Sequence, residues 1–118
     1  MLLASVERVE EKLRDLIERL DQSDDEVRDS LRDSLPEPRI LALHLDDLDR
    51  HYWTELSDGR MRGLHQGTPS DPDIRVRASS DELVSLIEGK SRLVPAYLTG
   101  RVKIKASFAE MLQLRKML

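Results

Sequence analysis

The chain has 118 residues, of which 39% are hydrophobic and 3% aromatic, and its formal net charge is -4. This length fits a single domain, and the negative net charge argues against nucleic acid as a partner, because phosphate backbones attract basic proteins. The absence of cysteine excludes disulfides, thiolate metal sites and cysteine nucleophiles. The apolar run at residues 1–6 is too short to span a membrane or to form a signal-peptide core. We therefore expect one cytoplasmic domain, residues 1–118, with no integral membrane segment.

Two helices are predicted within residues 1–35. Between residues 5 and 21 the apolar side chains recur at three- and four-residue spacing, which places them in one helical stripe. Ser23 and Glu26 then have the spacing of a capping box and predict the start of a second helix. That helix is expected to end before Pro36, because proline disfavours helical geometry in the residue that precedes it.

Four strands are predicted over residues 39–78. The first, from 40 to 45, is almost entirely apolar, as in a strand at the centre of a sheet. The dipeptide Asp58-Gly59 lies between two strand-like runs and predicts a hairpin turn. In the last run, from 74 to 78, apolar and basic residues alternate, which is typical of a strand with one exposed face.

Residues 79–118 are predicted to contain a helix, a last strand at 101–105 and a C-terminal helix. Ser79 and Ser107 each stand three residues before a glutamate and predict the two helix starts, and Gly89 suits a left-handed residue at the end of the first of these helices. The C-terminal helix has apolar residues on more than one side. It therefore needs a second surface besides the sheet, which can be a bound lipid, a partner subunit or the first helix of the domain.

The histidines are the candidates for metal or acid–base chemistry. If the strands pair across the predicted hairpin, His51 and His65 come close together, whereas His44 lies in an apolar strand. The spacing is not that of a known metal motif, and the sequence has no nucleophile elbow, phosphate-binding loop or dinucleotide fingerprint. We therefore predict no catalytic residues, no metal and no cofactor. The carboxylates that could join the histidines in a metal site are Asp46, Asp47 and Asp49.

Basic side chains alternate with apolar ones along two of the predicted strands. They could form a basic patch that meets an anionic head group, the phosphates of acyl-CoA or a membrane surface. The simpler interpretation, which the sequence favours, is solubilising charge on an exposed sheet face. The residues are Arg75, Arg77, Arg101, Lys103 and Lys105.

Four segments follow one another in a recognisable order: Tyr52–Gly59 with its Asp-Gly turn, Asp73–Val76, Asp81–Lys90 with its Gly-Lys end, and the basic strand within Tyr97–Lys105. In their order and spacing they resemble the sterol carrier protein type 2 family over most of the chain. The resemblance implies an α+β fold, in which a five-stranded, mostly antiparallel sheet is covered on one face by helices, with two N-terminal helices and one C-terminal helix.

The same resemblance implies non-enzymatic binding, and in some members transfer, of an apolar lipid such as a fatty acyl chain, acyl-CoA, phospholipid or sterol in a tunnel between sheet and helices. At Ala106-Ser107 the family commonly has a glycine and a polar residue, which puts the size and identity of the ligand in doubt. Two alternatives stay open: a homodimerisation or interaction module that uses the same apolar helical surface, and a small metal- or histidine-dependent enzyme. By position, the resemblance places these residues near the tunnel: Leu86, Ile87, Tyr97, Leu98, Ile104, Phe108, Met111 and Leu112.

Overall fold

The computed structural model describes residues 5–22, 38–57 and 60–118. The predicted second helix, which begins after Ser23, and the Asp58-Gly59 turn lie outside these residues. Of the helices described, none combines the length and the apolar character needed to cross a membrane. The elements in chain order are α1 (Val6–Asp21), β1 (Arg39–Leu45), β2 (Arg50–Ser57), β3 (Arg60–Gln66), β4 (Ile74–Ala78), α3 (Ser80–Ile87), α4 (Leu93–Leu98), β5 (Val102–Lys105) and α5 (Phe108–Met117).

The strands form one five-stranded sheet in the order β3-β2-β1-β4-β5. β1 and β4 run parallel, and the other neighbouring strands are antiparallel. β2 and β3 pair as far as Ser57 and Arg60, so they form the predicted hairpin. The predicted α+β class with a mostly antiparallel sheet is confirmed.

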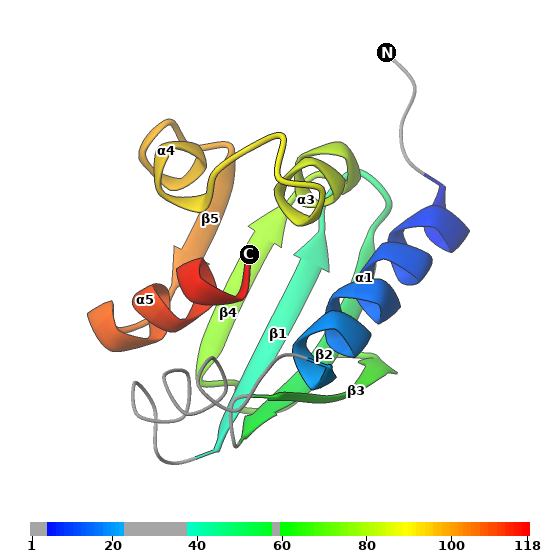
Figure 1. The fold of residues 1–118 in the computed structure, drawn as a ribbon, viewed down its shortest axis with the longest axis vertical. Helices are drawn as coiled ribbons and strands as arrows, with labels where there is room; N and C mark the ends of the chain where they lie inside the picture. Colours follow the sequence, from blue (N-terminus) through cyan, green and yellow to red (C-terminus); the bar gives the residue numbers. More distant parts are fainter. Residues whose placement is uncertain (1–4, 23–37, 58–59) are drawn as a thin grey trace.

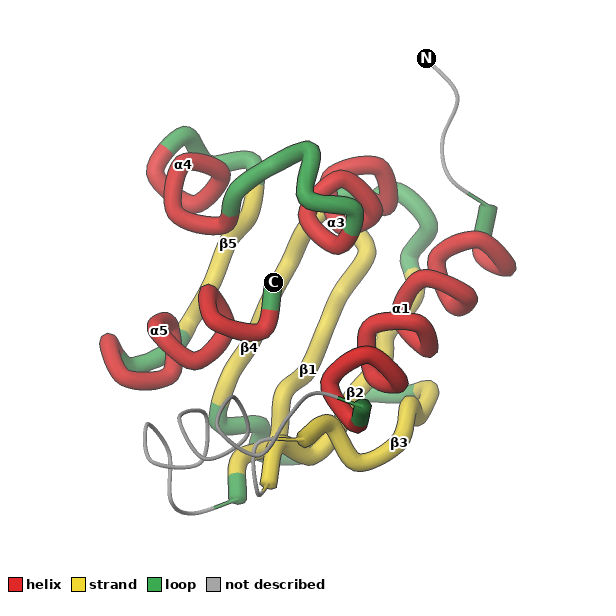
Figure 2. The backbone as a smooth tube through the Cα atoms, in the orientation of Figure 1, coloured by secondary structure: helices red, strands yellow, loops and turns green. Residues whose placement is uncertain are grey.

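The described helices lie on one face of the sheet and leave the other face open (Figures 1 and 2). β1 is in the centre of the sheet, as predicted, and its side chains alternate between the two faces. Leu41, Leu43 and Leu45 are buried beneath the helices, whereas Ala42 and His44 are half-buried on the open face. The two faces therefore offer different chemical surfaces, one apolar and one mixed.

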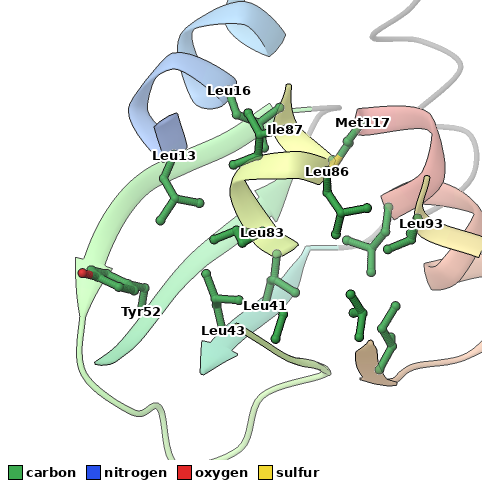
Figure 3. Close-up of a cluster of buried hydrophobic side chains, with 14 of the residues drawn as sticks. Leu13, Leu16, Leu41, Leu43, Tyr52, Leu83, Leu86, Ile87, Leu93 and Met117 are labelled. Carbon is green, nitrogen blue, oxygen red and sulfur yellow. The ribbon is translucent and has the colours of Figure 1, made fainter. Parts of the chain in front are cut away.

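The core is one apolar cluster between the sheet and the helices (Figure 3). Leu45 and Ile74 are completely buried, and each such side chain contributes about 1.5–3 kcal/mol relative to an exposed one. α3 and α5 both contribute to this layer, through Leu86 and Met117 among others (Figure 3). The stripe predicted for the first helix is confirmed by the buried residues Val9, Leu13, Leu16 and Leu20.

The β1–β2 turn holds the start of α3 against the sheet. The Asp47 carboxylate accepts hydrogen bonds from the Ser80 backbone N–H at 2.8 Å and from the Ser80 hydroxyl. Burial raises the pKa of Asp47, but the hydrogen bonds from Ser80 and from the backbone of Asp47 and Leu48 together outweigh burial, so the pKa lies below its ordinary value of 3.8. Ser79 caps α3 by accepting from the Glu82 N–H, while the Glu82 carboxylate accepts from the Ser91 hydroxyl. These contacts fix α3 at both ends.

α4 is a helix that the sequence analysis did not predict. Pro95 is the third residue of α4. In the first turn the backbone N–H groups have no partner within the helix, so proline is tolerated there. Gly89, by contrast, follows α3 with φ of 78°, the left-handed geometry that was predicted.

α5 begins with the predicted capping box. Ser107 accepts from the Glu110 N–H, and the Glu110 carboxylate accepts from the Ser107 N–H at 2.7 Å. Asp49 is the only non-glycine residue with positive φ among the described residues. Ala106, where the chain departs from the family pattern, therefore leads into α5 without backbone strain, and it packs against the core.

Candidate ligand-binding site

The buried members of the predicted ligand set line the layer between sheet and helices. Leu86 and Ile87 of α3 and Ile104 of β5 are buried there. Met111 and Leu112 of α5 are half-buried, and Met111 packs against the core. These five residues come from α3, β5 and α5.

The other three predicted ligand residues are exposed. Tyr97 and Leu98 of α4 are 42% and 75% exposed, and Phe108 at the start of α5 is 79% exposed. α4 and α5 flank β5 at the edge of the domain (Figure 1). Within the described part of the chain, every exposed large hydrophobic side chain comes from residues 94–118. Exposed apolar side chains concentrated in one region mark a binding surface.

The buried face of α5 is partly polar, which the sequence analysis missed. Gln113 is 2% exposed, yet its side-chain Oε1 accepts no hydrogen bond from any described residue. A buried acceptor without a donor costs about 1–3 kcal/mol. The signal was present in the sequence, because Gln113 lies three residues after the capping glutamate and four before Met117, on one helical face. The interior therefore keeps one unused hydrogen-bond acceptor next to apolar side chains.

An ion pair attaches the start of α5 to the sheet. The Glu110 Oε2 lies 3.1 Å from the Arg39 Nε at the beginning of β1. The exposed fractions of the two side chains are 10% for Glu110 and 27% for Arg39. Because water is largely excluded from this contact, removing either charge would leave the other without compensation and would destabilise the fold. This contact sets the position of the helix that carries Met111, Leu112 and Gln113.

A small hollow of about 40 Å³ lies between α1 and the sheet. Its walls are formed by Leu13 and Ile17 of α1 and by side chains of the first three strands, among them Leu43 and Met61. One buried water needs a site of about 10–15 Å³, whereas ligand pockets have volumes of about 300–1,000 Å³. This hollow is therefore too small for an acyl chain. It shows only that packing beneath α1 is incomplete.

The histidines are paired differently from the sequence prediction. His51 lies opposite His44, and their rings stack with centroids 4.2 Å apart. The Asp49 Oδ1 is 3.3 Å from the His44 Nε2 and 3.7 Å from the His51 Nε2. In the described residues this is the one cluster whose ligand atoms are close enough to share a metal ion. His65 stacks instead on Trp53, also with centroids 4.2 Å apart.

A groove of about 950 Å³ lies on the open face of the sheet. Its floor carries basic side chains of β4 and β5, and His44 and His51 lie at one end. The segment 67–72, which connects β3 to β4, forms one wall, and Tyr97 and Leu98 of α4 form the other. The groove therefore combines basic and apolar surfaces on the face that no described helix covers.

The sequence pattern of the SCP-2 sterol transfer family matches residues 10–118. The chain belongs to the SCP-2 sterol transfer family. The resemblance found in the sequence is thus confirmed, and it begins within α1 and includes every later element described. No curated protein shows significant sequence similarity to the chain.

Solved structures share the fold of this SCP-2 family member at low sequence identity. The sterol carrier protein domain 2 of Helicoverpa armigera has a TM-score of 0.72 at 17% identity, covering 97% of this chain and 89% of that one. Sterol carrier protein 2 from Yarrowia lipolytica has a TM-score of 0.59 at 19% identity, with coverage of 91% and 84%. At these identities the likeness shows the fold alone.

The fold also occurs as a small part of a larger enzyme. The sec-alkylsulfatase Pisa1 from Pseudomonas sp. has a TM-score of 0.58 at 18% identity. The match covers 73% of this chain but spans only 13% of the sulfatase. The likeness is thus confined to one portion of that enzyme.

Proposed function

We propose that this single domain binds an apolar lipid between the sheet and the helices α3, α4 and α5, without catalysing a reaction. The observation that carries the proposal is the concentration of exposed large hydrophobic side chains in residues 94–118, around β5, in a chain of this family. A structural neighbour with a TM-score of 0.64, SCP2L2 from Aedes aegypti, was solved in palmitated form. The cytoplasmic location stays a prediction.

The eight predicted residues then have different parts in binding. Leu86, Ile87 and Ile104 form the buried end of the site. Met111 and Leu112 line its side, and the exposed side chains on α4 and at the start of α5 form the entrance. Each methylene of the lipid that enters gains about 0.8 kcal/mol. Because leucine and methionine side chains repack easily, we expect the site to accept lipids of several lengths.

Gln113 supplies the polar contact of the proposed site. A ligand with a hydroxyl group, such as a long-chain alcohol, a sterol or a protonated fatty acid, can donate a hydrogen bond to the free Oε1. A buried acceptor that gains a donor stops costing free energy, so such ligands are favoured over hydrocarbons. The site is therefore proposed to bind lipids with a hydrogen-bond donor at one end.

Replacement of Gln113 by methionine, which has nearly the same shape, is expected to raise the free energy of unfolding of the lipid-free protein by about 1–2 kcal/mol. The reason is that the unpaired amide oxygen is removed from the interior. Urea unfolding measures the change. The Gln22→Met variant is the control, because Gln22 is exposed at the end of α1. A loss of stability in Gln113→Met would show that the Oε1 is already satisfied.

Binding is tested with a fluorescent fatty acid and its displacement by unlabelled palmitate. Saturable binding is expected, and Leu112→Glu should weaken it by about tenfold or more, because a carboxylate is placed against the acyl chain. Arg115→Glu, on the exposed side of the same helix, should leave binding unchanged. Absence of saturable binding would overturn the proposal. If light scattering then showed a stable dimer, the apolar side chains of residues 94–118 would be assigned to subunit association instead.

A further inference from the structure

We infer that the open face of the sheet carries a second site, in which the basic groove binds the phosphate head of an amphiphile. Its basic floor lies on the face of the sheet opposite to the proposed lipid site, and α4 borders both sites. The inference rests on the register of the basic residues, their lack of counter-charges and the two walls of the groove.

The register places like charges directly opposite each other. Arg75 of β4 lies opposite Lys105 of β5, and Arg77 lies opposite Lys103. Like charges in directly opposed positions of an antiparallel pair destabilise a sheet. The chain as a whole is acidic, with 23 acidic and 19 basic residues. A surplus of basic residues therefore does not explain why four of them gather on one patch.

Most of these cations have no partner within the described residues. Arg77 pairs with Asp46, with the Nε and Oδ2 atoms 3.5 Å apart. Arg75, Lys103 and Lys105 make no ion pair or side-chain hydrogen bond with any residue described, and all three are exposed. Solubilising charge explains basic residues on a surface, but it does not explain their opposed placement along a groove. A doubly charged phosphate would neutralise this surplus and accept hydrogen bonds from several of the cations at once.

The walls give the groove the shape of a small-molecule site. The Gly67 N–H donates to the His51 carbonyl, and the Asp73 N–H donates to the Ile40 carbonyl, both at 2.9 Å. Residues 67–72 are thus held beside the end of β1 at one side and beside its start at the other, and between these points they cross the open face of the sheet. The volume of about 950 Å³ lies in the range of ligand pockets, about 300–1,000 Å³. A flat bilayer matches such a recess poorly.

The second wall is apolar and makes an amphiphile the best occupant. Tyr97 and Leu98 stand at the β5 side of the groove and are exposed in the absence of a ligand. An inorganic phosphate would contact the basic floor and leave these side chains in water. A phosphate that carries a hydrocarbon chain contacts both surfaces, which is why we assign this ligand class.

The test is an NMR titration of backbone amides of the full chain at low salt with monododecyl phosphate below its micelle concentration. Saturable shifts are expected in β4, β5 and residues 67–72. The Arg75→Gln/Lys105→Gln variant should bind about tenfold more weakly or worse, because two charged donors are lost. The Arg19→Gln/Arg115→Gln variant has the same net charge, with the changes on exposed helix positions, and should bind like the unchanged protein.

Two further probes separate head group from chain. Inorganic phosphate should shift the same amides with lower affinity, and dodecyl maltoside, which has the same chain without charge, should not. Equal affinity in the two double variants, or no saturable shift in β4 and β5, would overturn the inference. Binding to phosphatidylglycerol vesicles without binding of dodecyl phosphate would assign the face to a bilayer and overturn it as well. Displacement of fluorescent fatty acid should be unchanged in Arg75→Gln/Lys105→Gln, so failure of one site is distinguishable from failure of the other.

Discussion

Replacing Glu110 by alanine is expected to lower the free energy of unfolding by about 3 kcal/mol. Two contacts disappear together: the ion pair with Arg39 and the hydrogen bond to the Ser107 N–H. Removal of the Glu110 carboxylate leaves the Arg39 guanidinium largely buried with one acceptor fewer. It also leaves the Ser107 N–H at the start of α5 without its acceptor. Because α5 carries one side of the proposed lipid site, fatty-acid affinity should fall in parallel.

Urea unfolding followed by circular dichroism measures the effect, and Glu110→Gln separates the two contacts. The glutamine can still accept from the Ser107 N–H but has no charge to offer Arg39. We expect it to lose roughly half as much stability as the alanine variant. If both variants were as stable as the unchanged protein, the junction between α5 and β1 would not hold the helix in place.

Above pH 10 the protein is expected to lose up to about 3 kcal/mol of stability through Tyr52 alone. Burial raises the pKa of Tyr52 to about 12, and the hydrogen bond to the Glu10 carboxylate and its negative charge act in the same direction. The ordinary value is 10.0. Since the folded-state pKa is the higher one, this contribution is complete below pH 10 and is lost as the pH rises from 10 to 12.

The comparison with Tyr52→Phe isolates this effect from the titration of lysines. At neutral pH the variant should be less stable by about 1 kcal/mol, because the hydrogen bond from the Tyr52 hydroxyl to the Glu10 Oε2, 3.0 Å long, is absent. Between pH 10 and 12 the difference should shrink and then reverse. Absorbance titration of Tyr97→Phe, in which Tyr52 is the only tyrosine, should show ionisation near pH 12. Ionisation near pH 10 in that variant contradicts the prediction.

Both predictions concern contacts that attach a helix to the sheet. The Tyr52–Glu10 hydrogen bond joins β2 to α1, and the Arg39–Glu110 ion pair joins β1 to α5. The apolar layer between them supplies most of the stabilisation, but it does not fix where along the sheet each helix lies, because hydrophobic contacts are not directional. The polar contacts supply that position, and they decide which side chains of α5 face the interior.

Local patterns were sufficient for most elements of this fold. The alternation of residues 74–78, the stripe of α1, the cap at Ser107 and the left-handed Gly89 each depend on neighbours within a few residues. The six-residue α4 was not predicted, because it is too short to show a helical period and has no side-chain cap. The sequence therefore predicted those helices and strands that have a capping residue or a regular spacing of apolar residues.

The sequence by itself determined the family, the order of the strands, the helices α1, α3 and α5, and the alternation that places basic side chains on one face of β4 and β5. The tertiary structure decided which side chains meet. His51 lies opposite His44, His65 stacks on Trp53, Arg75 lies opposite Lys105, and Gln113 is buried. The physical reason is range: helix caps and periodicity act between near neighbours along the chain, whereas register and helix position are set by contacts between residues far apart in it.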